Sequence, residues 1–247
     1  MKAVVLAGGN GTRLQPLTFA TNKHLLPVYD KPVLYYAIEK IVEAGIDKIM
    51  IVTSPHHIGS FVQLLGSGQR FVPKNSPAKQ IQIVYGIQNE PNGVAYGLYI
   101  AKDYIGNDTC MLFLGDNIIT DDLTPAVQNF TSGATVFLKK VKDPERFGVA
   151  VTDKKGSILS IEEKPEHPKS NLAVAGVYLY DTSVFEKMIG QPKSARGEYE
   201  ITYVNNKFIE EGTLTSHTLK KEWFDIGTVE SLHRASAYMK KQRHNEI

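Results

Sequence analysis

A glycine-rich segment near the start of the chain places two cationic side chains behind a short apolar run. Gly8, Gly9 and Gly11 follow the run KAVVLA, and Arg13 and Lys23 come shortly after the glycines. Glycines permit a tight turn whose bare backbone N–H groups point one way, and such a turn is a natural seat for phosphate. The segment therefore predicts a phosphate-binding loop behind a buried strand.

Two common phosphate-binding motifs do not fit this segment. The dinucleotide fingerprint GxGxxG requires a third glycine where Leu14 stands, and no acidic residue ends the next predicted strand to hold a ribose. The Walker pattern requires Lys and a hydroxyl residue where the chain has Thr12 and Arg13. These mismatches disfavour a nicotinamide-dependent oxidoreductase and a P-loop NTPase.

Two aspartates are candidates for a magnesium site. Asp116 follows the apolar run CMLFL in the motif LGDN, and Asp225 stands in WFDIGT. Ligands of open α/β sheets bind outside the carboxyl ends of the strands, and Mg²⁺ takes one or two carboxylates beside phosphate oxygens. Taken singly, Asp116 is equally well read as an Asx turn, and Asp225 as a helix N-cap near Thr228.

Further polar residues stand where loops are expected. Glu163 and Lys164 end a predicted strand in the motif IEEKP, where a solvated strand end is the simpler interpretation unless proline or a bulge turns the lysine inward. Arg196 precedes a glycine and offers a guanidinium fork to a sugar phosphate, or is a surface residue. The amide of Gln88 could hydrogen-bond the edge of a nucleotide base, and Gly93 could let the backbone approach its ring. The simpler interpretation is a turn before a helix.

The composition indicates an ordinary globular protein. The 247 residues are 42% hydrophobic and 22% charged, and 28 Lys and Arg balance 26 Asp and Glu. A chain of this length and balance can bury one large core. No basic stripe interleaved with aromatic residues is present, so we expect no nucleic-acid partner.

The single cysteine and the amino-terminal segment indicate the compartment. Cys110 lies in an apolar run, where a buried hydrophobe is a better interpretation than a nucleophile, and one cysteine excludes disulfides within the chain. The apolar run before the glycines is too short for a signal peptide, and no segment approaches the length of a membrane span. We therefore expect a cytoplasmic protein without a membrane partner.

The hydrophobic periods alternate between strands and helices. In the first part, strands are predicted at 2–7, 48–53, 80–84, 110–114 and 134–141, with helices at 32–44, 56–65, 93–105 and 121–130. After about residue 143 come closely spaced β segments, helices near 182–189 and 198–211, a strand near 213–219 and a last helix near 228–243. The pattern predicts an α/β fold: a mostly parallel sheet with helices on both faces, followed by a mixed α/β elaboration.

The motifs, in their order along the chain, resemble those of the sugar-nucleotide pyrophosphorylases, a nucleotidyltransferase family. They are LAGGNGTRLQPLT, NKHLLPVYDKP, LGDN, RFGVA, IEEKP, AVAGVYLYD, RGEYEIT and WFDIGT. The resemblance extends from Lys2 to about Leu232, and the GxGTRLxPLT motif with its downstream lysine is its most specific part. It implies a doubly wound, Rossmann-like mixed sheet with a sugar-binding α/β elaboration in a single large domain.

The resemblance is greatest to members that use dTTP and glucose 1-phosphate. It implies that a sugar phosphate oxygen attacks the α-phosphorus of dTTP in line, giving dTDP-glucose and pyrophosphate, with Mg²⁺ as cofactor. Positioning and charge neutralisation are the main demands of such a transfer. Alternatives are the same reaction with UTP, CTP or another sugar 1-phosphate, and a catalytically silent regulatory homologue that binds sugar nucleotides.

The resemblance also implies a role for individual residues. The catalytic cations are Arg13, Lys23 and Lys164, and the metal carboxylates are Asp116 and Asp225. The nucleotide is bound by Leu6, Gly8, Gly9, Gly11, Thr12, Gln88, Pro91 and Gly93. The sugar phosphate is bound by Asn117, Gly148, Glu163, Val174 and Arg196.

The same resemblance gives an organisation for the chain. We expect one nucleotidyltransferase domain over 1–247, with a nucleotide-binding part at about 1–142, a sugar-binding part at about 143–227 and a C-terminal helix at about 228–247. A homotetramer and a role in polysaccharide biosynthesis are implied as well. The chain ends 22 residues after Asp225 (247 minus 225), before the extra helices of longer relatives, which leaves product feedback open.

Three positions depart from the common pattern of the family. Ala175 stands where relatives often have Thr, Tyr96 where they often have Gln, and Tyr203 where Asp is usual. None of the three replaces a phosphate-binding cation or a metal carboxylate. The first two could alter the choice of sugar or base.

Overall fold

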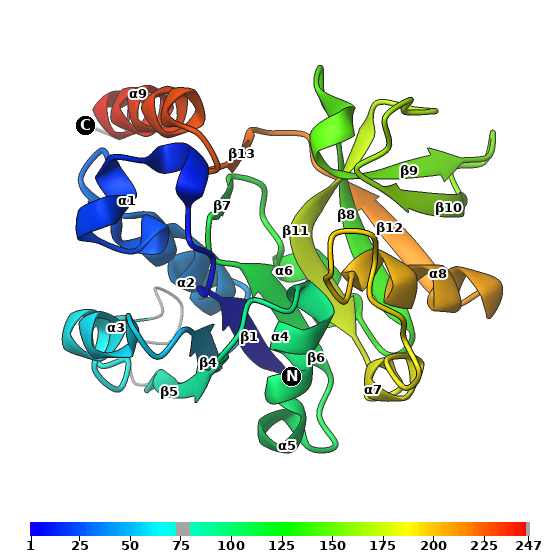
Figure 1. Ribbon diagram of the computed structural model, residues 1–247, viewed down its shortest axis with the longest axis horizontal. Coiled ribbons are helices and arrows are strands. Elements are labelled where there is room, and N and C mark those ends of the chain that lie inside the picture. The colour runs from blue at the N-terminus through cyan, green and yellow to red at the C-terminus, as the bar shows by residue number, and fades with distance from the viewer. Residues whose placement is uncertain (73–79, 246–247) are drawn as a thin grey trace.

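The computed structural model describes residues 1–72 and 80–245 (Figure 1). A nine-stranded mixed sheet runs through the molecule in the order β10-β9-β11-β6-β1-β4-β5, and β8 and β12 extend it beside β11. Its first part is parallel, as the alternation of periods predicts: β1 (Lys2–Leu6), β4 (Lys48–Thr53), β5 (Gln82–Ile87) and β6 (Cys110–Leu114).

The alternation of side chains along β1 explains why helices cover both faces. Ala3 and Val5 are buried in one hydrophobic cluster, whereas Val4 between them is buried in a second cluster on the opposite face. Successive side chains of a strand point to opposite faces, so a continuous apolar run requires cover on both. The first face packs against α2 (Val33–Glu43), α3 (Ile58–Leu65) and α6 (Thr124–Asn129), and the second against α4 (Val94–Ile100), α5 (Lys102–Ile105), α7 (Val184–Lys187) and α8 (Ile201–Glu210).

The later part of the chain joins the same sheet through antiparallel pairing. Strand β11 (Leu172–Tyr180) pairs antiparallel with β6, β8 (Ala134–Lys140) and β9 (Gly148–Thr152). Strand β10 (Ile158–Glu163) then pairs antiparallel with β9, while β12 (Leu214–Thr218) is parallel to β8. The sheet is therefore mixed, and both parts of the chain lie side by side in one continuous sheet (Figure 1).

Short elements that the hydrophobic periods do not reveal surround the glycine segment and the carboxyl edge of the sheet. The two 3₁₀ turns η1 (Thr12–Leu14) and η2 (Lys23–Leu25) follow the glycines, with α1 (Leu17–Ala20) between them. Two small antiparallel ribbons form from β2 (Pro27–Val28) with β3 (Lys31–Pro32), and from β7 (Asn117–Ile119) with β13 (Trp223–Asp225). The predicted helix at 93–105 is interrupted at Ala101, where α4 ends and α5 begins.

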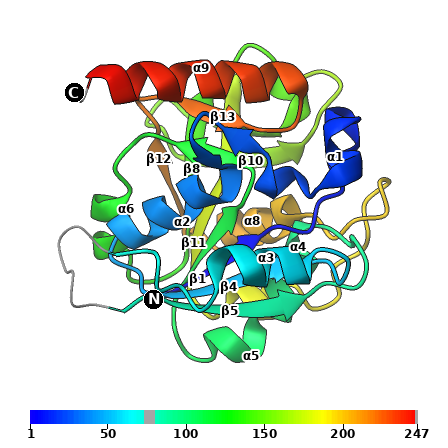
Figure 2. The ribbon, with the colours of Figure 1, turned by 90° about the vertical axis from the view of Figure 1, so that its left-hand side faces the viewer.

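The last helix, α9 (Val229–Asn245), packs along the outside of the first part (Figure 2). Thr228 caps it, because the Ser231 backbone N–H donates to Thr228 Oγ1 at 3.2 Å. The N-cap interpretation of Asp225 is therefore wrong: this residue ends β13 instead. Among the residues that the structure describes, no helix has the length and apolarity needed to cross a membrane.

We predict that the thiol of Cys110 does not react in the native protein. Its side chain is buried, and burial, with the carboxylate of Asp181 next in effect, raises its pKa to about 12, so the reactive thiolate is scarcely populated. Titration with a chromogenic disulfide should release no thiolate from native protein and one equivalent in guanidinium, because the chain has a single cysteine. Stoichiometric release from native protein would contradict the burial.

Candidate active site

A cleft of about 350 Å³ opens where the glycine segment meets the carboxyl ends of β1 and β6. Its walls come from both parts of the chain, because β11 brings β9 and β10 beside β6. The cleft is large enough for a small ligand, and its position at the strand ends is the usual one in α/β sheets.

Arg13 and Asp225 meet at Gly227. A Cβ atom at Gly227 would lie 2.9 Å from an Arg13 guanidinium nitrogen and 3.0 Å from Asp225 Oδ2, so a side chain there would displace one or both of these groups. The exposed Arg13 side chain thus extends from η1 into the cleft beside a carboxylate. This arrangement puts a fixed cation directly behind the glycines, where the sequence predicts a phosphate.

Lys23 forms an ion pair with Asp116. The Lys23 ammonium contacts Asp116 Oδ2, and the Asn117 amide donates to Asp116 Oδ1 at 2.8 Å. Burial by itself would raise the pKa of Asp116, but the neighbouring positive charge, first that of Lys23, and the hydrogen bonds from Lys23 and Asn117 together outweigh it and lower this pKa to about 2. The carboxylate is therefore ionised, and the Asx-turn interpretation is replaced by a paired charge.

The ribbon of β7 and β13 brings Asp225 beside Asp116. Asp225 lies opposite Asn117 in the ribbon, and the Ile226 backbone N–H donates to the Asp116 carbonyl at 2.9 Å. Burial, and next the negative charge of Asp116, raise the pKa of Asp225 to about 6. The side chain of Arg146 partly offsets this repulsion, with its guanidinium 3.4 Å from Asp225 Oδ2.

The two carboxylates suit a divalent cation. They lie close enough to repel one another, and a doubly charged ion between them would remove that repulsion. Among the described residues, no group of three or more His, Cys, Asp and Glu forms a complete ligand set. Two carboxylates completed by phosphate oxygens and water are the set that Mg²⁺ prefers. Asp116 and Asp225 therefore fit the expected Mg²⁺ when a phosphate ligand is bound.

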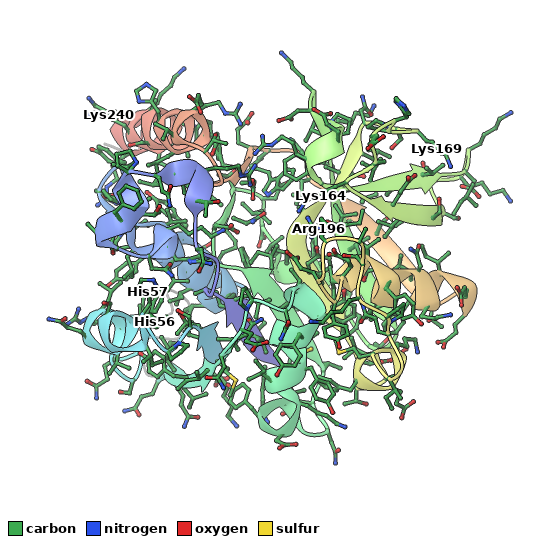
Figure 3. All side chains as sticks on the ribbon, in the orientation of Figure 1. His56, His57, Lys164, Lys169, Arg196 and Lys240 are labelled. Atoms are coloured by element: carbon green, nitrogen blue, oxygen red, sulfur yellow. The ribbon has the colours of Figure 1, made fainter. Side chains whose placement is uncertain are left out.

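The opposite wall carries Glu163, Lys164 and Arg196. The backbone of Lys164 has φ 44°, and this turn lets Glu163 and Lys164 both line the cleft although they are neighbours on a strand end. Thr202 Oγ1 donates to Glu163 Oε2 at 2.6 Å. Figure 3 shows Lys164 and Arg196 near one another, and their cationic groups lie 3.7 Å and 3.9 Å from Glu163 Oε1.

The structure brings most of the predicted site residues to this cleft. Leu6, Gly8, Gly9, Arg13, Lys23, Gln88, Pro91, Gly93, Asp116, Asn117, Gly148, Glu163, Lys164, Val174, Arg196 and Asp225 line it. Gly11 and Thr12 do not line the cleft. Gly11 caps the turn η1, where its φ is 61°, and Thr12 begins that turn.

Other cleft residues were not assigned from the sequence. Arg146 and Trp223 belong to motifs singled out there, but nothing in their spacing indicates that they contact Asp225 and Asn117. The Trp223 indole N–H donates to Asn117 Oδ1 at 2.6 Å, so it orients the amide that supports Asp116. Tyr178 and Thr202 also line the cleft, and only the fold reveals this.

Comparison with known proteins decides the family. A model of the family described as Nucleotidyl transferase matches residues 2–242. The chain belongs to the nucleotidyl transferase family. It is 44% identical over 246 residues to the glucose-1-phosphate thymidylyltransferase of Neisseria meningitidis serogroup A, with 97% of this chain and 82% of that relative covered. It is 41% identical over 245 residues to the protein of the same name from Mycobacterium tuberculosis, with 97% and 82% covered.

Solved structures of nucleotidyl transferases have the same fold. A putative glucose-1-phosphate thymidylyltransferase from Bacillus anthracis, in complex with a sucrose, matches with a TM-score of 0.88 at 45% identity, over 96% of this chain and 94% of that one. A UDP-glucose pyrophosphorylase complexed with UDP-glucose matches with a TM-score of 0.85 at 27% identity, over 97% and 98%. The sequence-based prediction of the family and of a mixed α/β fold is confirmed.

We predict that Lys23→Met destabilises this nucleotidyl transferase by about 3 kcal/mol, because it removes the cation that compensates the largely buried Asp116 carboxylate. The double variant Lys23→Met with Asp116→Asn should recover most of the loss. Urea unfolding measures the free energy of unfolding of each variant. As a control, Lys40→Met removes the surface ion pair with Glu43 and should cost at most about 1 kcal/mol. Equal losses in the single and double variants would contradict the pairing.

Proposed function

We propose that this nucleotidyl transferase converts dTTP and glucose 1-phosphate into dTDP-glucose and pyrophosphate, assisted by Mg²⁺. The observation that carries the proposal is the distribution of charge in the cleft. One pair of cations, Arg13 and Lys23, lies on the side of the glycine segment, and another, Lys164 and Arg196, lies on the opposite wall. The two carboxylates stand beside the first pair. Two phosphate-bearing substrates and one divalent cation fit this distribution.

The nucleotide binds at the glycine segment in this proposal. Arg13 and the backbone of Gly8 and Gly9 hold the triphosphate, and the Lys23 ammonium assists from the same side of the cleft. Gln88 contacts the edge of the base, since its amide has one donor and one acceptor face, and Gly93 lets the backbone approach the ring. Leu6 and Pro91 add apolar contacts beside them.

The sugar phosphate binds on the wall formed by β9, β10 and the loop before α8. Lys164 and Arg196 bind its phosphate, since a guanidinium fork and an ammonium both suit phosphate oxygens. Glu163, oriented by Thr202, accepts hydrogen bonds from sugar hydroxyls. Gly148, Val174 and Asn117 complete the contacts with the sugar. In this proposal most nucleotide contacts come from the part at about 1–142 and most sugar-phosphate contacts from the part at about 143–227, with Asn117 and Asp225 as the exceptions.

The reaction is a displacement at phosphorus. A phosphate oxygen of glucose 1-phosphate forms a bond to the α-phosphorus of dTTP, and the bond between the α-phosphorus and the bridging oxygen breaks as pyrophosphate leaves. The attacking oxygen is already ionised, so no general base is required. The protein contributes alignment of the two substrates and stabilisation of negative charge, in which Arg13 faces the departing pyrophosphate and Lys164 the nucleophile.

Asp116 and Asp225 would hold Mg²⁺, which would neutralise the phosphate charge that otherwise repels the nucleophile. The fixed cations contribute to the same end from the protein side. The ammonium of Lys23 contacts Asp116, so this cation lies next to the carboxylates that would hold the metal and within the part of the cleft assigned to the triphosphate. We further propose that the enzyme acts as a homo-oligomer, a tetramer, in the cytoplasm, which rests on the family resemblance.

We predict that pyrophosphate release, with Mg²⁺ and glucose 1-phosphate, is fastest with dTTP among dTTP, UTP, CTP, ATP and GTP. The relatives named thymidylyltransferases share 41–44% identity with this chain, against 27% for the UDP-glucose pyrophosphorylase, which supports the base preference. A coupled phosphate assay with pyrophosphatase measures the rates. If pyrophosphate release is fastest with UTP, the proposed type of reaction still holds, but the proposed preference for dTTP is wrong. No release with any nucleotide from folded protein would overturn the reaction itself.

We predict that Asp116→Asn and Arg13→Ala each abolish turnover, with a loss of at least about 100-fold, while the protein remains folded. The first removes a metal carboxylate and the second the cation facing the triphosphate. The same pyrophosphate assay measures the loss, and circular dichroism confirms folding. The control Arg243→Ala removes an exposed arginine paired with Asp30 outside the cleft and should keep full turnover. An active Asp116→Asn enzyme would refute the metal assignment.

A further inference from the structure

Two loops of the cleft, residues 88–95 and residues 193–200, are joined by direct hydrogen bonds. The Tyr199 backbone N–H donates to the Asn92 carbonyl at 2.8 Å, and the Ala95 backbone N–H donates to the Tyr199 carbonyl at 3.1 Å. The first loop carries Gln88 and Gly93, and the second carries Arg196. The backbone of Tyr199 is therefore bonded on both sides to the loop that faces the base.

Gly93 makes this contact possible. Its backbone has φ 100°, and a Cβ atom there would lie 2.6 Å from the Tyr199 carbonyl oxygen and 2.8 Å from the Tyr199 nitrogen. A side chain at this position would push the two loops apart, so glycine is required for the loop contact itself as well as for room beside the base. The two loops are thus held in direct contact by their backbones.

A layer of side chains reinforces the backbone contact. The rings of Tyr96 and Tyr199 stack with centroids 6.2 Å apart and an angle of 30° between their planes. The Lys193 ammonium lies 5.3 Å from the centre of the Tyr199 ring and donates to Asn92 Oδ1 at 3.0 Å. We call Asn92, Tyr96, Lys193 and Tyr199 the inter-loop bridge. Such ring and cation contacts at half-exposed sites are individually weak, so they can tune a loop without maintaining the fold.

The inter-loop bridge is adjacent in sequence to the groups that hold Arg196. The Arg196 guanidinium donates to Glu198 Oε2 at 2.8 Å, and its Nε donates to Glu200 Oε1 at 3.1 Å. Glu198 and Glu200 flank Tyr199, so a displacement of the Tyr199 backbone moves both carboxylates. The base loop is therefore connected to Arg196 through a continuous set of bonded residues.

We propose that the inter-loop bridge couples the two substrate sites: a base bound at residues 88–95 orders the Arg196 loop and so increases the affinity for the sugar phosphate. This inference rests on the proposed function, which places the base and the sugar phosphate at these loops. Tyr96 and Lys193 are positioning residues in it, because they act through Tyr199 and Asn92. Coupling is reciprocal, so the sugar phosphate also increases the affinity for the base by the same factor.

The test uses thymidine as the probe of the base site. Thymidine carries no phosphate, so it supports no transfer and has no charge that acts directly on a bound sugar phosphate. Calorimetry measures the Kd of the full chain for glucose 1-phosphate with and without saturating thymidine, and the Kd for thymidine with and without saturating glucose 1-phosphate. In the unmodified enzyme, each ligand at saturation should lower the Kd of the other by at least about fivefold.

Variants then locate the residues that carry the coupling. Tyr96→Leu and Lys193→Gln should each reduce the coupling factor toward one. Lys193 does not line the cleft, so Lys193→Gln should change the affinity for each ligand alone by less than about twofold. Tyr96→Phe keeps the stacked ring and should keep the coupling. The matched control is the double variant Tyr99→Leu with Lys102→Gln, since Lys102 lies 5.7 Å from the exposed Tyr99 ring in a similar contact that involves neither loop. The control should leave the coupling unchanged.

The outcomes separate this inference from the proposed function. Binding of both ligands with no coupling in the unmodified enzyme overturns the inference and leaves the proposed function standing. Coupling that persists in Tyr96→Leu and Lys193→Gln also overturns it. If folded enzyme binds neither ligand and releases no pyrophosphate from dTTP, the proposed function fails and the inference fails with it. Loss of coupling in both variants, with retention in Tyr96→Phe and the control, supports it.

Discussion

The repulsion between Asp116 and Asp225 is the constraint around which the cleft is built. Two ionised carboxylates repel one another where water does not fully surround them. Burial, and next this repulsion, raise the pKa of Asp225. The protein keeps them there by three means: the ion pair with Lys23, the guanidinium groups of Arg13 and Arg146, and the short ribbon that fixes their backbones. Perturbed pKa values of this kind cluster at functional sites.

The mixed sheet makes the cleft two-sided. A purely parallel sheet would place polar groups along one edge only, whereas the antiparallel strand β11 joins β6 to the hairpin of β9 and β10. This junction brings Glu163 and Lys164 opposite the glycine segment, although more than 140 residues separate them in sequence. The mixed sheet thus places two pairs of cations on opposite walls of one cleft within a single domain.

The sequence predicts the regular elements well because their patterns are local. The bounds of β4 and β6 agree with the predicted strands, since each is a continuous apolar run. The β7–β13 ribbon could not be predicted, because three-residue strands have no detectable period and these two lie about a hundred residues apart. Most site residues were located by their motifs, while Arg146 and Trp223 became visible only through their contacts with Asp225 and Asn117. Composition and spacing do not specify which side chains meet across a cleft.

The placement of Trp223 has a spectroscopic consequence. It is the only tryptophan of the chain, its indole N–H is hydrogen-bonded to Asn117, and its ring lies 4.9 Å from that of Phe147 at the cleft wall. Indole emission depends on the polarity and hydrogen bonding of its surroundings. The intrinsic tryptophan fluorescence of the protein therefore originates entirely within the cleft, and this enzyme has a built-in optical reporter of the state of its own active centre.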